Sequence, residues 1–277
     1  MQKRLQNYIW QKAVTASWLG ANEELLHEQT KGSYATIERP GTSRALLEAF
    51  CETRPAAEGL KWSFGGSIRP LPSDWRERFF AAHRTAPLKI GRRLIIAGEN
   101  TGDTAGPRLI IPAGVAFGTG EHATTAMSLR LLGWVTRPLP CGWRMLDAGT
   151  GSGILALAGW HFGARKVLGI DNDPMALATA KENARRNRIR GVTFVVGDVQ
   201  KRIRGTFDVI TANLYSELLV SVLPTFRESL VAEGSLILSG VLRQQERELT
   251  AALRAAEFRA AEIRRRGKWI ALLCVRR

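Results

Sequence analysis

The residues most able to do chemistry begin with a glycine-rich run, Asp147-Ala148-Gly149-Thr150-Gly151-Ser152-Gly153. An apolar strand-like segment precedes this run and an apolar helix-like segment follows it, so the run predicts a strand-to-helix turn. Glycine has no Cβ, which lets the backbone turn sharply and lets a ligand approach it closely. The run is therefore either a plain tight connection or a ligand-binding turn, in which Asp147, Gly149 and Gly151 are the candidate contacts.

The spacing of these glycines discriminates between classes of ligand. The dinucleotide fingerprint GxGxxG would require glycine at position 154, where this chain has Ile154. The P-loop motif is excluded because no Gly-Lys-Ser/Thr follows. GxGxG after an aspartate is the form associated with enzymes that use S-adenosylmethionine (SAM). Since SAM carries no phosphate, its turn requires close approach rather than a strong anion site.

Two further acidic residues end the next two predicted strands. Asp171 lies 22 residues after Gly149, and a carboxylate at that strand tip can accept hydrogen bonds from both ribose hydroxyls of an adenosyl group. Asp171 could instead cap a helix, but Asp173 is the better cap because Pro174 follows it. Asp198 ends the third strand, where it either meets the adenine edge or simply serves a turn.

Asn213 ends the fourth predicted strand, and ligands of open α/β sheets bind at the carboxyl ends of strands. Its amide can hold the amino-acid part of SAM or accept a hydrogen bond from a substrate amine, although asparagine is also simply common at strand ends. The backbone near Leu214 is a second candidate acceptor. Tyr215 is a candidate lining residue of the acceptor pocket, so Asn213 and Tyr215 are the predicted catalytic residues.

The chemistry expected of such a site is in-line transfer of the sulfonium methyl to a neutral amine. Because the leaving group is neutral, most of the work is positioning and desolvating the amine. A protonated lysine, with an ordinary pKa of about 10.4, must first lose its proton. No strong general base is visible in the sequence, and His122 is interpreted as anchoring its loop through a hydrogen bond.

The elements that must position these residues alternate regularly from about residue 112. A loop and a helix over 124–134 come first, and strands then alternate with helices of ten to fifteen residues. This pattern is typical of a parallel, doubly wound sheet. The predicted strands cover 143–148, 166–171, 192–198, 207–213 and 235–241, and a strand pair closes the chain over 258–276.

The first 70 residues predict a small α+β unit of short elements. Strands are expected over 9–17, 33–39 and 60–64, and helices over 18–29 and from a cap at Ser43 to Cys51. A connecting helix over 73–86 and strands over 88–97 and 108–111 follow. The predicted domains are therefore a small domain over 1–70, a linker helix over 71–88 and a doubly wound domain over 89–277.

Composition limits the possible partners and compartments. The 277 residues are 45% hydrophobic and contain no apolar run of the roughly 18 residues that a membrane span needs, and no signal-peptide core. Three separated cysteines predict neither a disulfide framework nor a metal site, so we expect a cytoplasmic protein without metal. A formal charge of +15 indicates either attraction to polyanions such as RNA or a solvated basic surface. Basic clusters lie at 201–204 and 264–268.

Several motifs in order resemble those of the ribosomal protein L11 methyltransferase family. The segment Ala116 to Thr125 resembles the family's AFGTGxHxTT, and LDAGTGSGILALAG resembles its strand, glycine turn and helix. GIDNDPMALATAKENARRN and DWRERFFAAHRTAPLKIGRRLII resemble two further family segments. The similarity covers roughly residues 73 to 245.

The resemblance implies a Rossmann-like SAM methyltransferase domain behind a small ferredoxin-like domain that recognises the substrate. It implies SAM contacts at Thr125, Gly149, Asp171 and Asn213, and a segment over the cofactor that includes Phe117, Thr119 and Gly120. The implied activity is methylation of amino groups, an N-terminal amine and lysines, of ribosomal protein L11, with S-adenosylhomocysteine as product.

One departure from the family pattern lies beside the predicted acceptor site. Where the family usually reads Ile-Leu-Ala after the asparagine, this chain has Leu214-Tyr215-Ser216. Two alternatives therefore stay open. The methylated partner could be an RNA or another protein, or the protein could be a SAM-binding module without turnover.

Overall fold

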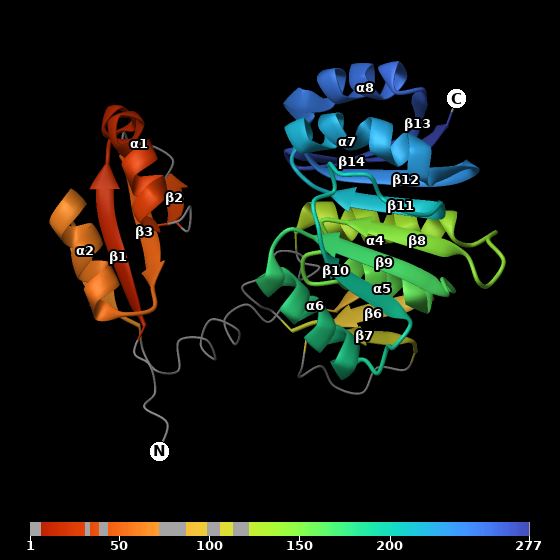
Figure 1. Cartoon of the computed structure of the whole chain (residues 1–277), viewed down its shortest axis with the longest axis horizontal. Coiled ribbons are helices and arrows are strands. Elements are labelled where there is room, and N and C mark those ends of the chain that lie inside the picture. The colour runs from red at the N-terminus through yellow and green to blue at the C-terminus, as the bar shows by residue number, and fades with distance from the viewer. Residues whose placement is uncertain are drawn as a thin grey trace. The chain divides into compact units, whose positions relative to one another are not determined.

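A computed structural model describes residues 7–30, 34–38, 44–71, 87–98, 106–112 and 122–276. The chain forms two compact units, residues 1–83 and 84–277, each of which has its own core. The first unit is drawn from red to orange in Figure 1, and the second from yellow to blue. The predicted linker helix over 73–86 lies outside the described residues.

The first unit is an antiparallel sheet with the strand order β2-β3-β1-β4. Its elements alternate as β-α-β-β-α-β, and with that strand order they make the ferredoxin-like arrangement. The bounds are β1 (Tyr8–Val14), α1 (Ala16–Thr30), β2 (Tyr34–Glu38), β3 (Ala45–Cys51), α2 (Arg54–Phe64) and β4 (Ser67–Pro70). Trp10 is fully buried at its centre, packs near Phe64 and donates its indole N–H to the Gly65 carbonyl at 2.8 Å.

Two predicted elements of this unit were wrong in type. The stretch that ends at Cys51 is strand β3 rather than a helix, because it pairs with both β1 and β2 and buries alternate residues such as Leu47 and Ala49. Residues 60–64 are the end of helix α2 rather than a strand. Thr53 caps that helix by accepting a hydrogen bond from the Ala56 N–H. In the first case, strong helix formers favour a helix over a stretch that tertiary pairing makes a strand. In the second case, the signal for the helix is the cap at Thr53, which lies upstream of the stretch predicted as a strand.

The second unit contains a seven-stranded sheet with the order β10-β9-β8-β11-β12-β14-β13. The first five strands in this order run parallel, and β14 pairs in an antiparallel manner with both β12 and β13. The predicted doubly wound arrangement is therefore confirmed, with an antiparallel pair at one edge. Its elements are α4 (Ala123–Val135), β8 (Arg144–Ala148), α5 (Ile154–His161), β9 (Lys166–Asp171), α6 (Pro174–Arg186), β10 (Val192–Val196), β11 (Phe207–Asn213), α7 (Ser216–Ser229), β12 (Leu230–Leu242), η1 (Arg243–Gln245), α8 (Glu246–Ala255), β13 (Phe258–Arg266) and β14 (Trp269–Arg276).

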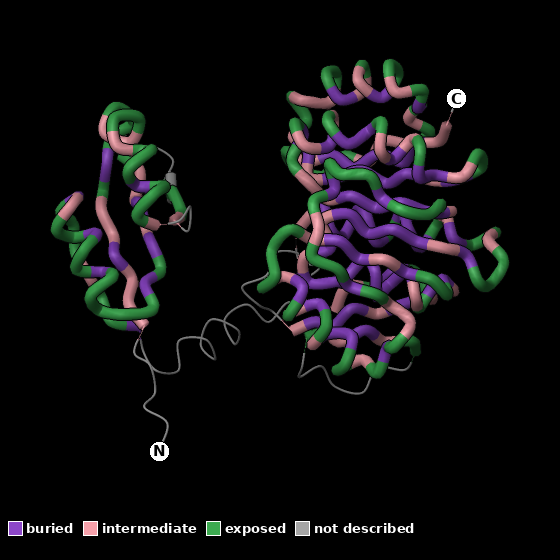
Figure 2. The backbone as a smooth tube through the Cα atoms, viewed as in Figure 1, coloured by how far each residue is buried: buried purple, intermediate pink, exposed green. Residues whose placement is uncertain are grey.

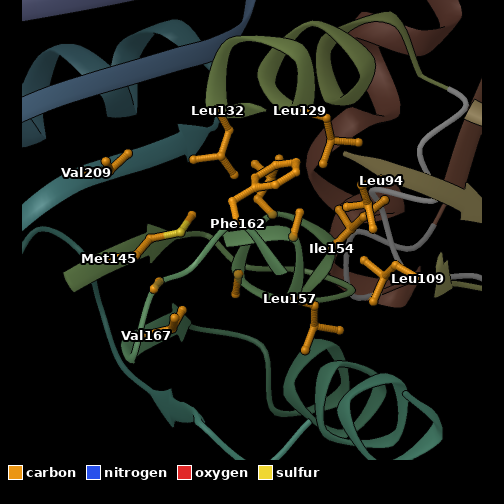
Figure 3. Packing of buried hydrophobic residues seen from close by; sticks show 14 of the residues in the cluster. Leu94, Leu109, Leu129, Leu132, Met145, Ile154, Leu157, Phe162, Val167 and Val209 are labelled. Atoms are coloured by element: carbon orange, nitrogen blue, oxygen red, sulfur yellow. The ribbon is translucent and has the colours of Figure 1, made fainter. Parts of the chain in front are cut away.

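Helices cover both faces of this sheet, because consecutive residues of each strand point to opposite sides. Met145 of β8 joins a core with α4, α5 and α6, whereas the next residue, Leu146, joins a core with α7 and α8. Figure 3 shows Met145 in the first of these cores with Leu132, Ile154 and other apolar side chains. The central strands of the sheet are largely buried, whereas the edge strands β10 and β13 include exposed residues (Figure 2).

A small sheet of three strands, β5 (Leu88–Ile90), β6 (Leu94–Ala97) and β7 (Arg108–Ile110), completes the unit. The predicted single strand over 88–97 is in fact a hairpin, because Gly91 adopts a positive φ and begins a turn. The side-chain amide of Asn187 fastens β7 to the end of α6. Its Oδ1 accepts from the Ile110 N–H and its Nδ2 donates to the Ile110 carbonyl, both at 2.7 Å.

No helix within the described ranges is long and apolar enough to cross a membrane. The described residues also hold no cluster of three or more histidine, cysteine or acidic side chains that could bind a metal ion.

Candidate functional site

The glycine turn connects β8 to α5 at the carboxyl end of the parallel strands. Gly149, Gly151 and Gly153 have φ values of 70°, 53° and 80°, in the left-handed region that other L-residues avoid. A Cβ on Gly149 would lie 2.3 Å from Cδ2 of Leu214, and one on Gly153 would lie 3.0 Å from the Cβ of Ala180. Glycine is therefore required at both positions by backbone conformation and by close packing.

The backbone N–H groups of this turn are already hydrogen bonded within the protein. Gly149 and Thr150 both donate to the Ile170 carbonyl, at 2.8 and 2.9 Å, and Gly153 donates to the Thr150 carbonyl. Gly151 donates to Oδ2 of Asp171 at 2.8 Å. A phosphate site needs such N–H groups to point at the ligand. This turn therefore suits a ligand that requires close approach, as the sequence predicts.

Asp147 lies beneath the turn and is 1% exposed. Its Oδ1 accepts from the hydroxyl of Thr211 at 2.6 Å, and its Oδ2 accepts from the Thr150 hydroxyl and the Ala156 N–H. Burial raises its pKa to about 6, and these hydrogen bonds oppose the rise. The structure places Asp147 below the cleft rather than in its lining, so the predicted cofactor contact stays a prediction that this position of the side chain does not support. Asp147 instead ties β8, β11, the turn and α5 together.

Asp171 lies at the rim, at the end of β9. Its Oδ2 accepts from Gly151 and its Oδ1 accepts from the Asp173 N–H at 3.1 Å. Each carboxylate oxygen retains lone-pair capacity for a further donor such as a ribose hydroxyl. Asp173 caps α6 by accepting a hydrogen bond from the Met175 N–H at 2.8 Å. The prediction that Asp173 rather than Asp171 caps this helix is therefore confirmed.

Asn213 lies at the end of β11, next to α4. Its Nδ2 donates to the hydroxyl of the buried Thr125 at 3.4 Å. Its Oδ1 is buried and has no hydrogen-bond partner among the described residues. A buried carbonyl oxygen without a partner costs free energy in a folded protein, which indicates that a ligand donor completes it.

These groups line one cleft of about 280 Å³. The cleft is lined by Thr125, Gly149, Thr150, Gly151, Ile154, Leu155, Asp171, Asn172, Gly197, Asp198, Val199, Gln200, Asn213, Leu214, Tyr215 and Leu218. Asp171 and Asp198 are the charged members, and no basic side chain is among the described residues of the lining. A lining of apolar surface with carboxylates favours a cationic, partly apolar ligand over a phosphate-bearing one.

The comparisons with known proteins agree with this geometry. The family model described as ribosomal protein L11 methyltransferase (PrmA) matches residues 70–277. The chain belongs to the ribosomal protein L11 methyltransferase family. The predicted SAM-dependent protein methyltransferase class is thereby confirmed, and with it the predicted cofactor.

Individual members of the ribosomal protein L11 methyltransferase family match most of the chain. The enzyme of Thermus thermophilus is 36% identical over 78% of this chain and 86% of its own length. The enzyme of Chloroflexus aurantiacus is 33% identical over 94% of this chain and 88% of its own. The solved ribosomal protein L11 methylase of Lactobacillus delbrueckii subsp. bulgaricus superposes with a TM-score of 0.63 at 29% identity. That match covers 70% of this chain and all of that one.

The structure brings together most of the residues singled out from the sequence. Thr125, Gly149, Gly151, Asp171, Asp198, Asn213 and Tyr215 all line the cleft. Asp198 also serves its turn, because its Oδ1 accepts from the Gln200 N–H at 2.9 Å. Phe117, Thr119 and Gly120 lie outside the described residues, so their place over the cofactor stays a prediction of the family resemblance.

Sequence reasoning missed the residues that complete the walls of the cleft. Asn172 directly follows Asp171, and Val199 and Gln200 follow Asp198, so proximity along the chain was the available signal. Leu214 was singled out for its backbone, but its side chain lies over Gly149 and its N–H donates to the Ser239 carbonyl at 3.0 Å. Gly240 has a φ of 90°, and a Cβ there would lie 2.3 Å from the Leu214 carbonyl oxygen.

His122 immediately precedes α4. Its Nδ1 lies 2.7 Å from the hydroxyl of Thr124, and its ring packs edge-on against Trp269. Burial and the nearby charge of Lys268 lower its pKa. His122 does not line the cleft, and the preceding loop that it is predicted to anchor lies outside the described residues, so that role stays a prediction.

Proposed function

We propose that this protein transfers methyl groups from SAM to amino groups of ribosomal protein L11, an N-terminal amine, lysines or both, in the cytoplasm. The observation that carries the proposal is the buried Oδ1 of Asn213, a residue that lines the cleft, because no donor among the described residues bonds to this oxygen. An amine nucleophile has an N–H to donate to that oxygen. The relatives named above are ribosomal protein L11 methyltransferases, which supports the same acceptor.

The cleft fits SAM on its own chemistry. Gly149 and Gly151 have no side chains, which lets a ligand approach the turn closely, and the apolar residues Ile154 and Leu155 also line the cleft. The two carboxylates of the lining attract a cationic ligand. We assign the ribose hydroxyls to Asp171 and the adenine edge to the neighbourhood of Asp198. When bound, SAM supplies an electrophilic methyl whose S–C bond breaks as the N–C bond forms, with the electron pair remaining on sulfur.

The chain's own residues position the acceptor. Asn213 Oδ1 accepts one N–H of the neutral amine, which turns the amine lone pair toward the reacting carbon. The Thr125 hydroxyl accepts a hydrogen bond from Nδ2 of the same amide and holds the amide in this orientation. Tyr215 is 61% exposed at the mouth of the cleft, where its ring can pack against the stem of the incoming side chain. We assign recognition of the protein substrate to the small domain over 1–70.

The test is incorporation of tritiated methyl from SAM into ribosomal proteins from cells that lack this gene. We expect one small labelled protein band, and we expect Asn213→Ala to reduce the initial rate by about 100-fold, because a lost orienting hydrogen bond costs roughly 2–3 kcal/mol at the transition state. The affinity for SAM, measured by calorimetry, should change far less. Label that is sensitive to nuclease would indicate an RNA acceptor. SAM binding without label on any pool would indicate a binding module.

The pH dependence of the rate distinguishes the two kinds of amine. No lysine or histidine side chain is among the described residues of the cleft, so the acceptor's own ionisation should govern the rate. An N-terminal amine, with a pKa near about 8, predicts a rate that levels off above that pH. A lysine, with a pKa of about 10.4, predicts a rate that continues to rise about tenfold per pH unit through pH 9.

A further inference from the structure

A second hollow, of about 190 Å³, lies in the unit formed by residues 84–277. Four of its eight lining residues are arginines, which come from the β5–β6 turn, from α4 and the residues just after it, and from β13. The lining is Ile90, Gly91, Arg93, Arg130, Gly133, Trp134, Arg137 and Arg264. None of these residues lines the cleft described above. We call this hollow the arginine pocket.

Two of the arginines have structural partners. Arg93 donates to the Gly133 carbonyl at 2.6 Å, to the Thr136 hydroxyl at 2.9 Å and to the Phe162 carbonyl at 3.3 Å. Its guanidinium also lies over the ring of Phe162. Arg264 pairs with Glu262 at 2.6 Å. Arg93 thus joins the β5–β6 turn to α4 and to the end of α5, and among the described residues its hydrogen-bond partners are all neutral.

Arg130 and Arg137 have no such partners. Both are exposed, and neither side chain forms a hydrogen bond or an ion pair within the described part of the chain. Burial and the neighbouring charge of Arg137 lower the pKa of Arg93, which indicates that the two guanidinium groups repel each other. Like charges held together in a concave surface favour an anion between them.

An aromatic side chain completes the arginine pocket. Trp134 is 47% exposed, although most large apolar side chains of this unit are buried. It lies four residues after Arg130 on α4, so the two side chains share one face of the helix. An exposed ring beside guanidinium groups is the combination with which proteins bind single-stranded nucleic acid. Bases stack on the ring while arginines contact the phosphates.

We propose that the arginine pocket binds single-stranded RNA, with Arg130 and Arg137 on backbone phosphates and one base stacked on Trp134. The formal charge of +15 favours the same polyanionic partner. This RNA is a docking partner and not the methyl acceptor, so the proposal is independent of methyl transfer. Sequence inspection could not find this site, because Arg93, Arg130 and Arg264 are far apart along the chain.

The experiment measures fluorescence anisotropy of a short labelled oligouridylate with the full-length protein at several salt concentrations. Arg130→Gln/Arg137→Gln should weaken binding about tenfold and reduce the slope of log K against log salt by about 1.4, because each single-strand phosphate contact contributes about 0.7. The control is Arg202→Gln/Arg204→Gln, which removes the same charge from two exposed arginines outside the pocket. It should weaken binding twofold or less.

Trp134→Ala tests the stacking contact separately. It should weaken binding about tenfold, as expected for one stacked base, and leave the salt slope unchanged. Trp134→Phe should restore most of the affinity, because a ring is retained. All variants should keep the thermal unfolding midpoint within a few degrees and the SAM affinity within twofold. A variant that fails this check is replaced by a milder one: the single change Arg130→Gln or Arg137→Gln, which should reduce the salt slope by about 0.7, or Trp134→Leu, which removes the ring but keeps an apolar side chain.

Several results would overturn the proposal. Wild-type protein that does not bind the oligonucleotide, or equal weakening by the pocket variant and the control variant, would show that the arginine pocket is not an RNA site. Binding of inorganic phosphate by calorimetry without RNA binding would assign it to a free anion. Tighter binding of a polyglutamate peptide than of RNA, with the same dependence on Arg130 and Arg137, would assign it to an acidic protein.

Discussion

The floor and the rim of the cleft contain the same kinds of polar side chain, but their hydrogen bonding differs. On the floor, Asp147 is buried and accepts hydrogen bonds from the Thr150 and Thr211 hydroxyls and from the Ala156 N–H. On the rim, Asp171 retains capacity for further donors, and Asn213 Oδ1 has no donor in the described structure. Polar groups that the protein satisfies hold the site together, whereas those with remaining capacity are the ones that we propose bind ligand.

This difference explains why two aspartates that each end a parallel strand have different roles. Asp147 and Asp171 end neighbouring strands, β8 and β9, and both lie next to the glycine turn. Asp147 lies under the turn, and Asp171 lies in front of it. Floor variants should therefore change mainly the free energy of unfolding, and rim variants should change mainly binding or rate.

We expect the largest loss of stability and of SAM binding at Gly149, because a side chain there would overlap Leu214. Gly149→Ala places a Cβ 2.3 Å from the Leu214 side chain at a φ of 70°, so strain and overlap together should cost about 4 kcal/mol. Gly142→Ala is the matched control, since its φ is 102° but nothing lies within 4 Å of its Cβ. Calorimetry should show SAM binding lost in Gly149→Ala alone. Equal SAM affinities in the two variants would contradict the close packing.

Floor residue Asp147 should give stability a pH dependence. Its folded pKa of about 6 exceeds its ordinary value of 3.8, so the folded state binds the proton more tightly than the unfolded state. Stability from this group is therefore present below pH 4 and lost as the pH rises through 6, by roughly 3 kcal/mol in total. Urea unfolding at several pH values should show this loss for the wild type and not for Asp147→Asn. Parallel curves for the two proteins would refute the assignment.

Asp171, on the rim, should contribute to the affinity for SAM. Asp171→Ala removes the acceptor assigned to the ribose and should weaken SAM binding by about 30-fold, equivalent to roughly 2 kcal/mol. Asp173→Ala, two residues later, removes the cap of α6 and should cost about 1 kcal/mol of stability while leaving SAM affinity within twofold. If Asp173→Ala weakened SAM binding as much as Asp171→Ala, the ribose assignment would be wrong.

The smallest effect is expected at the outermost rim residue. Tyr215 is largely exposed, so Tyr215→Ala should cost less than about 1 kcal/mol of stability. Its ring is assigned to the acceptor stem, and its loss should raise the KM for the protein substrate a few-fold without changing the KM for SAM. Steady-state kinetics with each substrate varied in turn would measure this, and a change confined to SAM would argue against the assignment.

Sequence reasoning predicted the second unit far better than the first. Strands such as β8 and β11 consist mostly of buried residues, because helices cover both of their faces, and each ends at or next to a polar residue. In the first unit β3 contains strong helix formers, and only its pairing with β1 and β2 makes it a strand. Short elements buried on one face are decided by partners that lie far away in the sequence.

The same distinction applies to the site. Residues at strand ends, such as Asp171 and Asn213, could be found because a parallel sheet gathers them at one edge. The floor position of Asp147 could not be predicted, because it depends on Thr211, 64 residues away. The position of the Leu214 side chain against Gly149 likewise could not be predicted, because it depends on packing between two loops that are far apart in the sequence.

A crystal structure of the protein with S-adenosylhomocysteine tests the central claim most directly. The account predicts the ribose hydroxyls within hydrogen-bonding distance of Asp171, the nucleoside against Gly149, and the sulfur facing Asn213. Density for the nucleoside elsewhere in the molecule, or a bound ligand that leaves Asp171 without contact, would contradict the account.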